Sequence, residues 1–412
     1  MEIIRLNETQ FNNYSNIHRN KNICQTIEYS HIEELRDKNS LYLGLLDENN
    51  NVCAACLLIE NYLPYNMKMG YIPGGFLIDY TNYYLLNIFI EELKKYLKKL
   101  KYTYIITNPF YYQRIISDSK TIDNTHLTDY MKRLGFITLN YKNKFSKYDI
   151  IIQNSNHKDI YKNFNRNTKR SIKQSINMGI ILKKGNINTI NQFYELIRKK
   201  TKHSINYYND LMTMLNSDNM KMEIFFSMLN PKEHLINAKK NYLKEKARNE
   251  KIQSNFLKNQ KSNKEKLLNK KMASDELLKK LSDDLAKASK LYEKYPEGIT
   301  IGSCAIIRNN KEIYFLIDGY NDKLKSIHSS HILKWKIIRH YSKQGYKIFN
   351  LGEISNNYKD KNDKYYGLYL YKKGFGGDII EYPPDMQLII DENKYFIYSN
   401  ICKLKGKPIL KR

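Results

Sequence analysis

The chain has 412 residues, of which 69 are lysine or arginine and 42 are acidic, so its formal net charge is +27. A hydrophobic fraction of 42% excludes a largely disordered protein, and the longest apolar run, Val52–Ile59, is far shorter than the ~20 residues that cross a bilayer. The length predicts two or three domains. Five scattered cysteines and an N-terminus without a signal-peptide pattern predict a cytoplasmic location.

Residues 1–155 predict a first α/β domain. Its elements are strand-like runs at 41–46, 52–59 and 67–72, an amphipathic helix with apolar residues at 85, 89, 93, 96 and 97, a strand at 102–107, and the basic turn Lys132-Arg-Leu-Gly-Phe136.

A glycine-rich segment, Gly70-Tyr-Ile-Pro-Gly-Gly-Phe-Leu-Ile-Asp79, joins the third of these strands to the helix. Gly74 and Gly75 permit positive φ angles and close backbone approach, so exposed N–H groups there can hold an anion. A plain tight turn would have the same sequence, and the spacing alone favours the turn.

Residues 158–184 contain eight basic side chains and one acid, a net charge of +7. The apolar residues Ile160, Phe164, Ile172 and Ile176 predict an amphipathic helix with a basic outer face, which suits phosphate backbones or anionic lipid headgroups. An ordinary solvated helix face is the alternative.

The 64 residues between Pro231 and Pro296 contain no glycine or proline and carry a net charge of +9. They predict two long helices that reverse direction within 259–264 and form an antiparallel arm, residues 232–295. The second helix has a coiled-coil seam, whereas the first is looser; an ordinary helix pair packed on the body is the alternative. The apolar residues of the seam are Leu278, Leu281, Leu285, Ala288 and Tyr292, and those of the first helix are Ile236, Leu243, Ala247, Phe256 and Leu257.

Residues 156–231 and 296–412 predict a second α/β domain that repeats the first. Strands at 299–307 and 312–317, a helix around Trp335, a strand at 346–351 and the turn Tyr371-Lys-Lys-Gly-Phe375 recur in the same order. A lysine in this turn can bind phosphate or stabilise a developing oxyanion, although solvated lysines at an element end would look the same.

Together these segments resemble the Fem family of peptidoglycan interpeptide-bridge aminoacyltransferases (the FemA/FemB/FemX type). The motifs that carry the resemblance are Gln25, Tyr71-Ile-Pro-Gly-Gly-Phe-Leu-Ile-Asp79, Asn165-Arg-Asn-Thr-Lys-Arg-Ser-Ile-Lys173 and Leu368–Gly377. The resemblance implies an α/β (α+β) fold of two GNAT-like domains with an inserted antiparallel coiled-coil helical arm.

The resemblance implies an enzyme that moves an amino acid from aminoacyl-tRNA to the stem peptide of a peptidoglycan precursor, either lipid II or UDP-MurNAc-pentapeptide. It implies no metal and no cofactor. Further expected contacts are the inner face of the cell membrane, touched peripherally, and sister Fem-type transferases. An acyl-CoA-dependent N-acyltransferase of the GNAT type and a non-catalytic tRNA- or membrane-binding protein are the alternatives.

The resemblance also assigns roles by position. Lys372, after the aromatic Tyr371, would stabilise the oxyanion or the terminal ribose-phosphate, and Asn108 stands where the family has an aspartate proposed to assist proton removal. Because an amide is not a base, the proton would need another route. His203 and Tyr207 would hold the precursor, with histidine in place of the family's arginine. The other expected substrate-binding residues are Gly74, Gly75, Asp79, Arg166 and Arg170.

The charge has two readings. The chain has 57 Lys and 12 Arg, and an AT-rich genome yields such a composition without any function. Two segments of 64 and 27 residues nevertheless carry +9 and +7 and are short of acids, which favours a polyanion partner. The expected tRNA-binding residues lie on the arm and are Lys244, Arg248, Lys251, Lys270 and Lys271.

Overall fold

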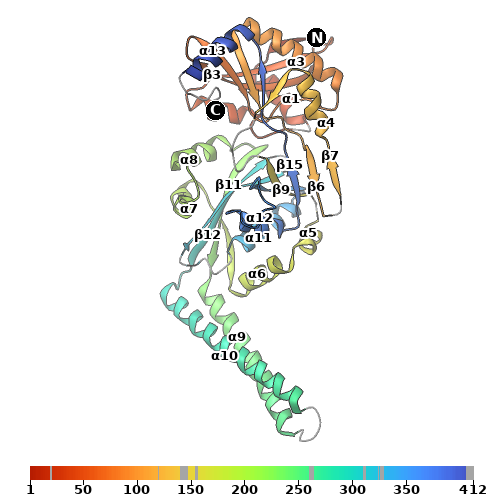
Figure 1. Cartoon of the computed structure of the whole chain (residues 1–412). Helices are drawn as coiled ribbons and strands as arrows, with labels where there is room; N and C mark the ends of the chain where they lie inside the picture. The colour runs from red at the N-terminus through yellow and green to blue at the C-terminus, as the bar shows by residue number, and fades with distance from the viewer. Residues whose placement is uncertain are drawn as a thin grey trace.

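The computed structural model describes residues 1–18, 21–118, 120–139, 147–153, 156–258, 264–309, 312–322, 324 and 329–404. Within these ranges the chain forms two α/β bodies, each built around one sheet, and a long helical hairpin that projects from the second body (Figure 1). None of the helices in these ranges combines the length and apolar content that a membrane span requires.

The first sheet has seven described strands. Their order is β1 (Glu2–Arg5), β2 (Ser40–Leu46), β3 (Val52–Leu63), β4 (Met67–Ile72), β5 (Tyr102–Thr107), β16 (Met386–Ile389) and β8 (Phe136–Thr138). Helix α3 (Tyr83–Lys99) covers one face. The other face is covered by α1 (Glu8–Ile17), α2 (Ile27–Glu34) and α13 (Glu392–Leu404), and α4 (Thr125–Arg133) precedes β8.

Helix α3 forms where the sequence predicts it. Asn82 caps it by accepting from the Leu85 N–H at 3.1 Å, and two lysines in its last turn match the helix dipole. Phe89 and Leu93 are fully buried against the sheet. Burial of such a side chain contributes roughly 1.5–3 kcal/mol.

The second sheet has nine described strands. Their order is β10 (Ile180–Lys184), β11 (Met220–Leu229), β12 (Ile299–Asn309), β13 (Glu312–Tyr320), β14 (Ile348–Ile354), β9 (Tyr148–Gln153), β15 (Asp378–Glu381), β6 (Arg114–Ile116) and β7 (Thr121–Asp123). On one face lie α5 (His157–Asn163), α6 (Arg166–Asn177) and α11 (Ser329–Lys343). The other carries α7 (Ile190–Ile197) and α8 (Ile205–Met214), and a short 3-10 turn at Ile187–Thr189 precedes α7. Helix α12 (Tyr366–Lys373) follows β14, and its Tyr369 and Tyr371 pack against the apolar cluster that contains α11.

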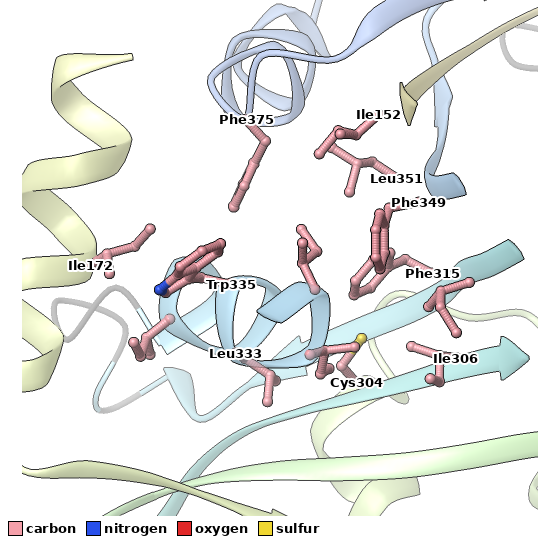
Figure 2. Packing of buried hydrophobic residues seen from close by; sticks show 14 of the residues in the cluster. Ile152, Ile172, Cys304, Ile306, Phe315, Leu333, Trp335, Phe349, Leu351 and Phe375 are labelled. Carbon is pink, nitrogen blue, oxygen red and sulfur yellow. The ribbon is translucent and has the colours of Figure 1, made fainter. Parts of the chain in front are cut away.

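The core of the second body lies between α11 and the strands. Figure 2 shows Trp335, Phe375 and Phe349 directed into this space from three different elements. Phe349 and Phe375 are fully buried, and Trp335, the single tryptophan of the chain, is 9% exposed. This packing explains why the Gly-Phe turn matters: Phe375 anchors the end of α12 in the core.

The predicted internal repeat is present. Each sheet is antiparallel except for one pair among its described strands, β4–β5 in the first and β13–β14 in the second. The strands of each parallel pair are joined by one helix, α3 or α11. Parallel neighbours require such a crossover connection.

The two sheets exchange segments across the domain boundaries predicted from the sequence. Strand β16 and helix α13, from the predicted second domain, belong to the first body, whereas β6, β7 and β9, from the predicted first domain, complete the second sheet. Strand pairing between distant segments caused this difference, because local patterns predict a strand without naming its partner.

The arm consists of α9 (Pro231–Lys258) and α10 (Lys264–Lys294), which pack side by side and extend away from the first body (Figure 1). On α10, Ala288 of the predicted seam is fully buried and Leu281 half-buried, whereas Tyr292 is 36% exposed. The predicted reversal at 259–264 lies mostly outside the described residues.

On α9 the predicted apolar face is wrong, since Ile236 and Leu243 are 57% and 51% exposed. The buried side chains are instead Ala238, Glu245 and Asn249. The polar ones are satisfied across the hairpin: Ser274 Oγ donates to Glu245 at 2.7 Å, and Asn249 Nδ2 donates to the Asp275 carboxylate at 2.7 Å. Polar residues on the inner face concealed the seam from an apolar-pattern analysis.

The basic stretch at 158–184 is not one helix. It breaks at Phe164, after which Asn165 caps α6 by accepting from the Thr168 N–H at 2.8 Å. Ile160, Phe164 and Ile172 are buried as predicted, whereas Ile176 is 51% exposed.

Candidate functional site

A cavity of about 380 Å³ lies between the two sheets and draws its walls from both bodies. The first body contributes the ends of β4 and β5, with Gly74 and Asn108. The second contributes Tyr207 from α8 and a group of strand residues around Tyr314. Three residues predicted from separate motifs, Gly74, Asn108 and Tyr207, are therefore brought to one cavity.

The Pro73-Gly74-Gly75 segment is a turn whose shape requires glycine. Gly74 and Gly75 have φ angles of +70° and +73°, and a Cβ on Gly75 would lie 2.6 Å from the Tyr80 hydroxyl and 2.7 Å from the Phe110 nitrogen. The Gly74 N–H donates to Asn108 Oδ1 at 3.0 Å, so this N–H is not available to an anion. The structure supports the tight-turn reading at this position.

The buried side chain of Gln25 supports this turn. Its Nε2 donates to the Pro73 carbonyl at 2.6 Å and to the Leu57 carbonyl at 3.2 Å, and its Oε1 accepts from the Leu57 N–H at 2.7 Å. Gln25 thus ties the turn to β3 and orients one wall of the cavity.

Three carboxylates line the second-body wall: Asp149 of β9, Glu312 of β13 and Glu353 of β14. They are called the carboxylate cluster below. Burial raises the pKa of all three, that of Glu312 to about 7, and the charge of Asp149 adds to the effect on the other two. Sequence reasoning missed them; the available signal was a single acid in each of the apolar strands β9 and β14, whereas β13 carries Asp318 as well as Glu312.

The carboxylate cluster is connected by neutral donors. Asn350 Nδ2 donates to Asp149 at 2.9 Å, and the Tyr382 hydroxyl donates to the same carboxylate at 3.3 Å. Asp149 and Glu353 are direct cross-strand partners in the β9–β14 pair.

Lys372, at the end of α12, lies next to this wall but does not itself line the cavity. Its Nζ donates to the Glu353 carbonyl at 2.7 Å. Burial, and after it the positive charge of Lys334, lowers the pKa of Lys372 to about 8, against the opposing effect of Asp149 and Asp318. The ammonium form therefore predominates at neutral pH, with the free amine within reach.

Tyr371 points away from the cavity into the body. Its ring packs edge-on to His331, with ring centres 4.7 Å apart, and the Lys334 ammonium lies 5.6 Å from its ring centre. Lys334 is 3% exposed and forms an ion pair with Asp318, which also contacts Lys200 at 3.4 Å. Tyr371 thus acts in packing that holds α12.

His203 and Tyr207, the two residues expected to hold the precursor, lie side by side. Their rings stack with centres 3.9 Å apart at 13°. Burial and the charge of Arg36 lower the pKa of His203, so this imidazole is a poor cation at neutral pH. A cation is present nearby, because the guanidinium of Arg36, which follows the end of α2, lies 5.2 Å from the Tyr207 ring centre.

The remaining predicted substrate-binding residues lie apart from the cavity. Asp79 is exposed and accepts from the N–H and hydroxyl of Thr81 at 2.9 and 2.6 Å, which forms a local turn. Arg166 and Arg170 are exposed on α6. The start of α6 lies against the glycine turn after α12, because the Asn165 N–H donates to the Gly374 carbonyl at 2.9 Å.

The predicted tRNA-binding residues lie on the arm, and none of them lines the cavity. Lys244, Lys251 and Lys270 are exposed. Arg248 contacts Glu245 at 3.4 Å, and Lys271 is held at 2.5 Å from Asp275 and 2.9 Å from the Asn249 amide oxygen, so these two cations belong partly to the arm's own contacts. In the part of the chain that the structure describes, no group of three His, Cys, Asp or Glu side chains is placed to hold a metal ion.

Comparison with known proteins shows which family shares this sequence and architecture. A family model described as the FemAB family matches residues 6–403. Aminoacyltransferase FemA of Staphylococcus epidermidis is 24% identical over 412 residues, covering 92% of this chain and 95% of the relative. Aminoacyltransferase FemA of Staphylococcus aureus is 22% identical over 436 residues, covering 99% and 100%.

Among solved structures, the crystal structure of FemX matches with a TM-score of 0.73 and 19% identity, over 96% of this chain and 99% of that one. This likeness concerns the fold, and it extends over both bodies. With a family match across nearly its whole length, the chain belongs to the FemAB family.

Proposed function

We propose that the protein is an aminoacyltransferase that takes an amino acid from aminoacyl-tRNA and adds it to an amine on the stem peptide of a peptidoglycan precursor, lipid II or UDP-MurNAc-pentapeptide. FemAB membership and the aminoacyltransferase relatives support this reaction. The observation that carries it is the cavity between the two bodies, which Lys372 adjoins through Glu353.

The chemistry is aminolysis of an ester. A neutral amine attacks the ester carbon, negative charge develops on the ester oxygen, and the ribose hydroxyl leaves. Such a reaction requires orientation of both substrates and a cation or N–H donor at the oxyanion. Lys372 is our candidate donor, because it is protonated at neutral pH and its position is fixed by the Glu353 carbonyl.

Asn108 acts by orientation. Its amide oxygen accepts from the Gly74 N–H, and the Tyr71 hydroxyl lies 3.4 Å away, so it holds the two strand ends that form the first-body wall. His203 and Tyr207, stacked at the α8 side, are the surface on which we place the precursor's sugar or peptide.

We place the tRNA on the second body and the arm. The arm is the best-exposed basic element, and α6 presents Arg166 and Arg170 beside the glycine turn that follows Lys372. We further infer that each body has a GNAT-like order of strands and helices and that the arm is a coiled coil. We also infer that the enzyme is cytoplasmic, touches the inner face of the membrane and works beside sister transferases.

The test is transfer by the full chain. Purified protein is incubated with radiolabelled Gly-, Ala- or Ser-tRNA and either lipid II or UDP-MurNAc-pentapeptide, and labelled muropeptide is quantified. We expect product from at least one donor, and the absence of product from all of them would reject the proposal.

Two lysine substitutions test whether Lys372 acts in catalysis or in tRNA binding. Lys372→Ala should lower transfer about 100-fold or more while tRNA affinity changes little, as expected for a lost oxyanion donor. Lys361→Ala, which removes an exposed loop lysine, is the matched control and should transfer normally. Unchanged transfer by Lys372→Ala would contradict its role as the oxyanion donor.

A further inference from the structure

The carboxylate cluster concentrates negative charge on one wall of the cavity. Asp149 is 6% exposed, and its cross-strand partner is Glu353. Directly opposed like charges on neighbouring strands are unfavourable unless something offsets them. Glu312 is linked to the same group, because Asn350 bonds to both it and Asp149.

The described cations offset this charge only in part. Lys372 acts on both Asp149 and Glu353, but its hydrogen bond goes to the Glu353 backbone carbonyl and not to a carboxylate. Lys21 and Asp385 also line the cavity, with charges of opposite sign. Three carboxyl groups therefore face space with one buried ammonium beside them.

Further acceptors face the same space. Asn309 also lines the cavity, and its Oδ1 is buried with no hydrogen-bond partner among the described residues. A buried acceptor without a donor costs free energy, and a ligand that donates a hydrogen bond would supply the missing partner. A primary ammonium has three donors and a positive charge, which matches acceptors and carboxylates together.

We propose that this wall is the acceptor-amine subsite, where the ammonium of the stem peptide binds among Asp149, Glu312 and Glu353 and loses its proton to Glu312. This assignment rests on the proposed function. It makes the carboxylate cluster the proton acceptor of the reaction, a role that the amide of Asn108 cannot take, and it selects acceptors that present a primary amine.

The step balances as follows. One proton of R–NH₃⁺ passes to the Glu312 carboxylate, which leaves a neutral amine. The amine lone pair forms the C–N bond to the ester carbon, and the C–O bond to the tRNA ribose breaks. The second amine proton ends on the ribose oxygen, so the products are an amide, a ribose hydroxyl and a protonated Glu312, which returns its proton to water. The raised pKa of Glu312, about 7, suits this exchange near neutral pH.

The experiment compares two acceptors on the full chain. One is UDP-MurNAc-pentapeptide with its free side-chain amine, and the other is the same molecule with that amine acetylated. Dissociation constants are measured by calorimetry at pH 7.5, and transfer to the free amine is measured in parallel. We expect the wild type to bind the free-amine form about 10- to 100-fold more tightly, the range for hydrogen bonds to a charged group.

The double variant Glu312→Gln/Glu353→Gln should lose this preference. The matched control, Glu48→Gln/Glu392→Gln, removes two exposed carboxylates and should keep it. Transfer by the wild type without any preference for the free amine would overturn the subsite, as would a preference that survives in the Glu312→Gln/Glu353→Gln variant.

The experiment distinguishes failure of the proposed reaction from failure of the proposed ammonium subsite. A wild type that transfers nothing but still prefers the free amine would reject the proposed reaction and leave the ammonium site standing. Because the comparison of acceptors uses the wild type, it remains decisive even if the double variant does not fold.

Discussion

The ion pair between the buried Lys334 and the half-buried Asp318 gives a prediction that can be worked through in detail. Lys334 lies on α11 with its side chain 4% exposed, and Asp318 lies on β13. Although burial opposes its ionisation, the charges of Lys334 and Lys200 hold the pKa of Asp318 well below its usual value. The substitution is Asp318→Asn, which keeps the shape and removes the charge.

The expected cost follows from the unpaired lysine. Removing one partner of a buried pair leaves an uncompensated charge and costs about 3–5 kcal/mol. Lys200 does not rescue it, because it is the same sign and its side chain is 40% exposed. Removing both charges in Asp318→Asn/Lys334→Met should restore most of the loss, since buried pairs contribute little net stability over apolar residues.

The assay is urea unfolding at pH 7, followed by the fluorescence of Trp335. This residue neighbours Lys334 in the chain, is the single tryptophan and lies in the second-body core, so it reports on this body. The control is Asp322→Asn, whose carboxylate is 56% exposed and contacts Lys199; it should cost less than about 1 kcal/mol. The reasoning fails if Asp318→Asn costs less than about 1 kcal/mol or if the double variant is no more stable than the single one.

Three further predictions concern the site and the arm. Since the pKa of Glu312 is raised to about 7, its carboxyl favours the folded state below its unfolded pKa of about 4.5, and that contribution is lost as pH rises through 7. Glu312→Gln should therefore flatten the fall in melting temperature between pH 5 and 8, and an unchanged slope would contradict this. Gln25→Ala should lower the free energy of unfolding by about 2–5 kcal/mol, because three buried backbone groups lose their partner; an unchanged thermal midpoint would count against it. Replacing the exposed Lys244, Lys251 and Lys270 by alanine should weaken tRNA binding, measured by filter binding. The slope of log affinity against log salt concentration between 50 and 200 mM should fall by about 3. An unchanged affinity would indicate that the tRNA binds elsewhere than on the arm.

The sequence predicted what depends on local periodicity. Helix α3 and its strand neighbours, the two arm helices and the repeat of strand, helix and strand all appear where the apolar spacing indicates. The sequence allowed two interpretations of Gly74 and Gly75, an anion site and a tight turn. The close contacts around Gly75 decide for the turn.

Patterns failed where long-range contacts override local ones. The first arm helix buries Glu245 and Asn249, because Ser274 and Asp275 of the second helix supply their partners. Ile176, apolar in a basic helix, remains 51% exposed. In the arm the decisive atoms come from the other helix, which periodicity along one helix does not describe.

By itself the sequence determined the two-body α/β organisation, the basic arm and the family resemblance, because these follow from spacing and motif order along one chain. Only the tertiary structure decided which strands complete which sheet and where the site lies. Asp149, Glu312 and Glu353 come from three strands separated by up to about 200 residues, and only the β9–β14–β13 pairing brings them together opposite Asn108. Their raised pKa values arise from burial, to which the charge of Asp149 adds for Glu312 and Glu353, and both causes exist only in the folded chain.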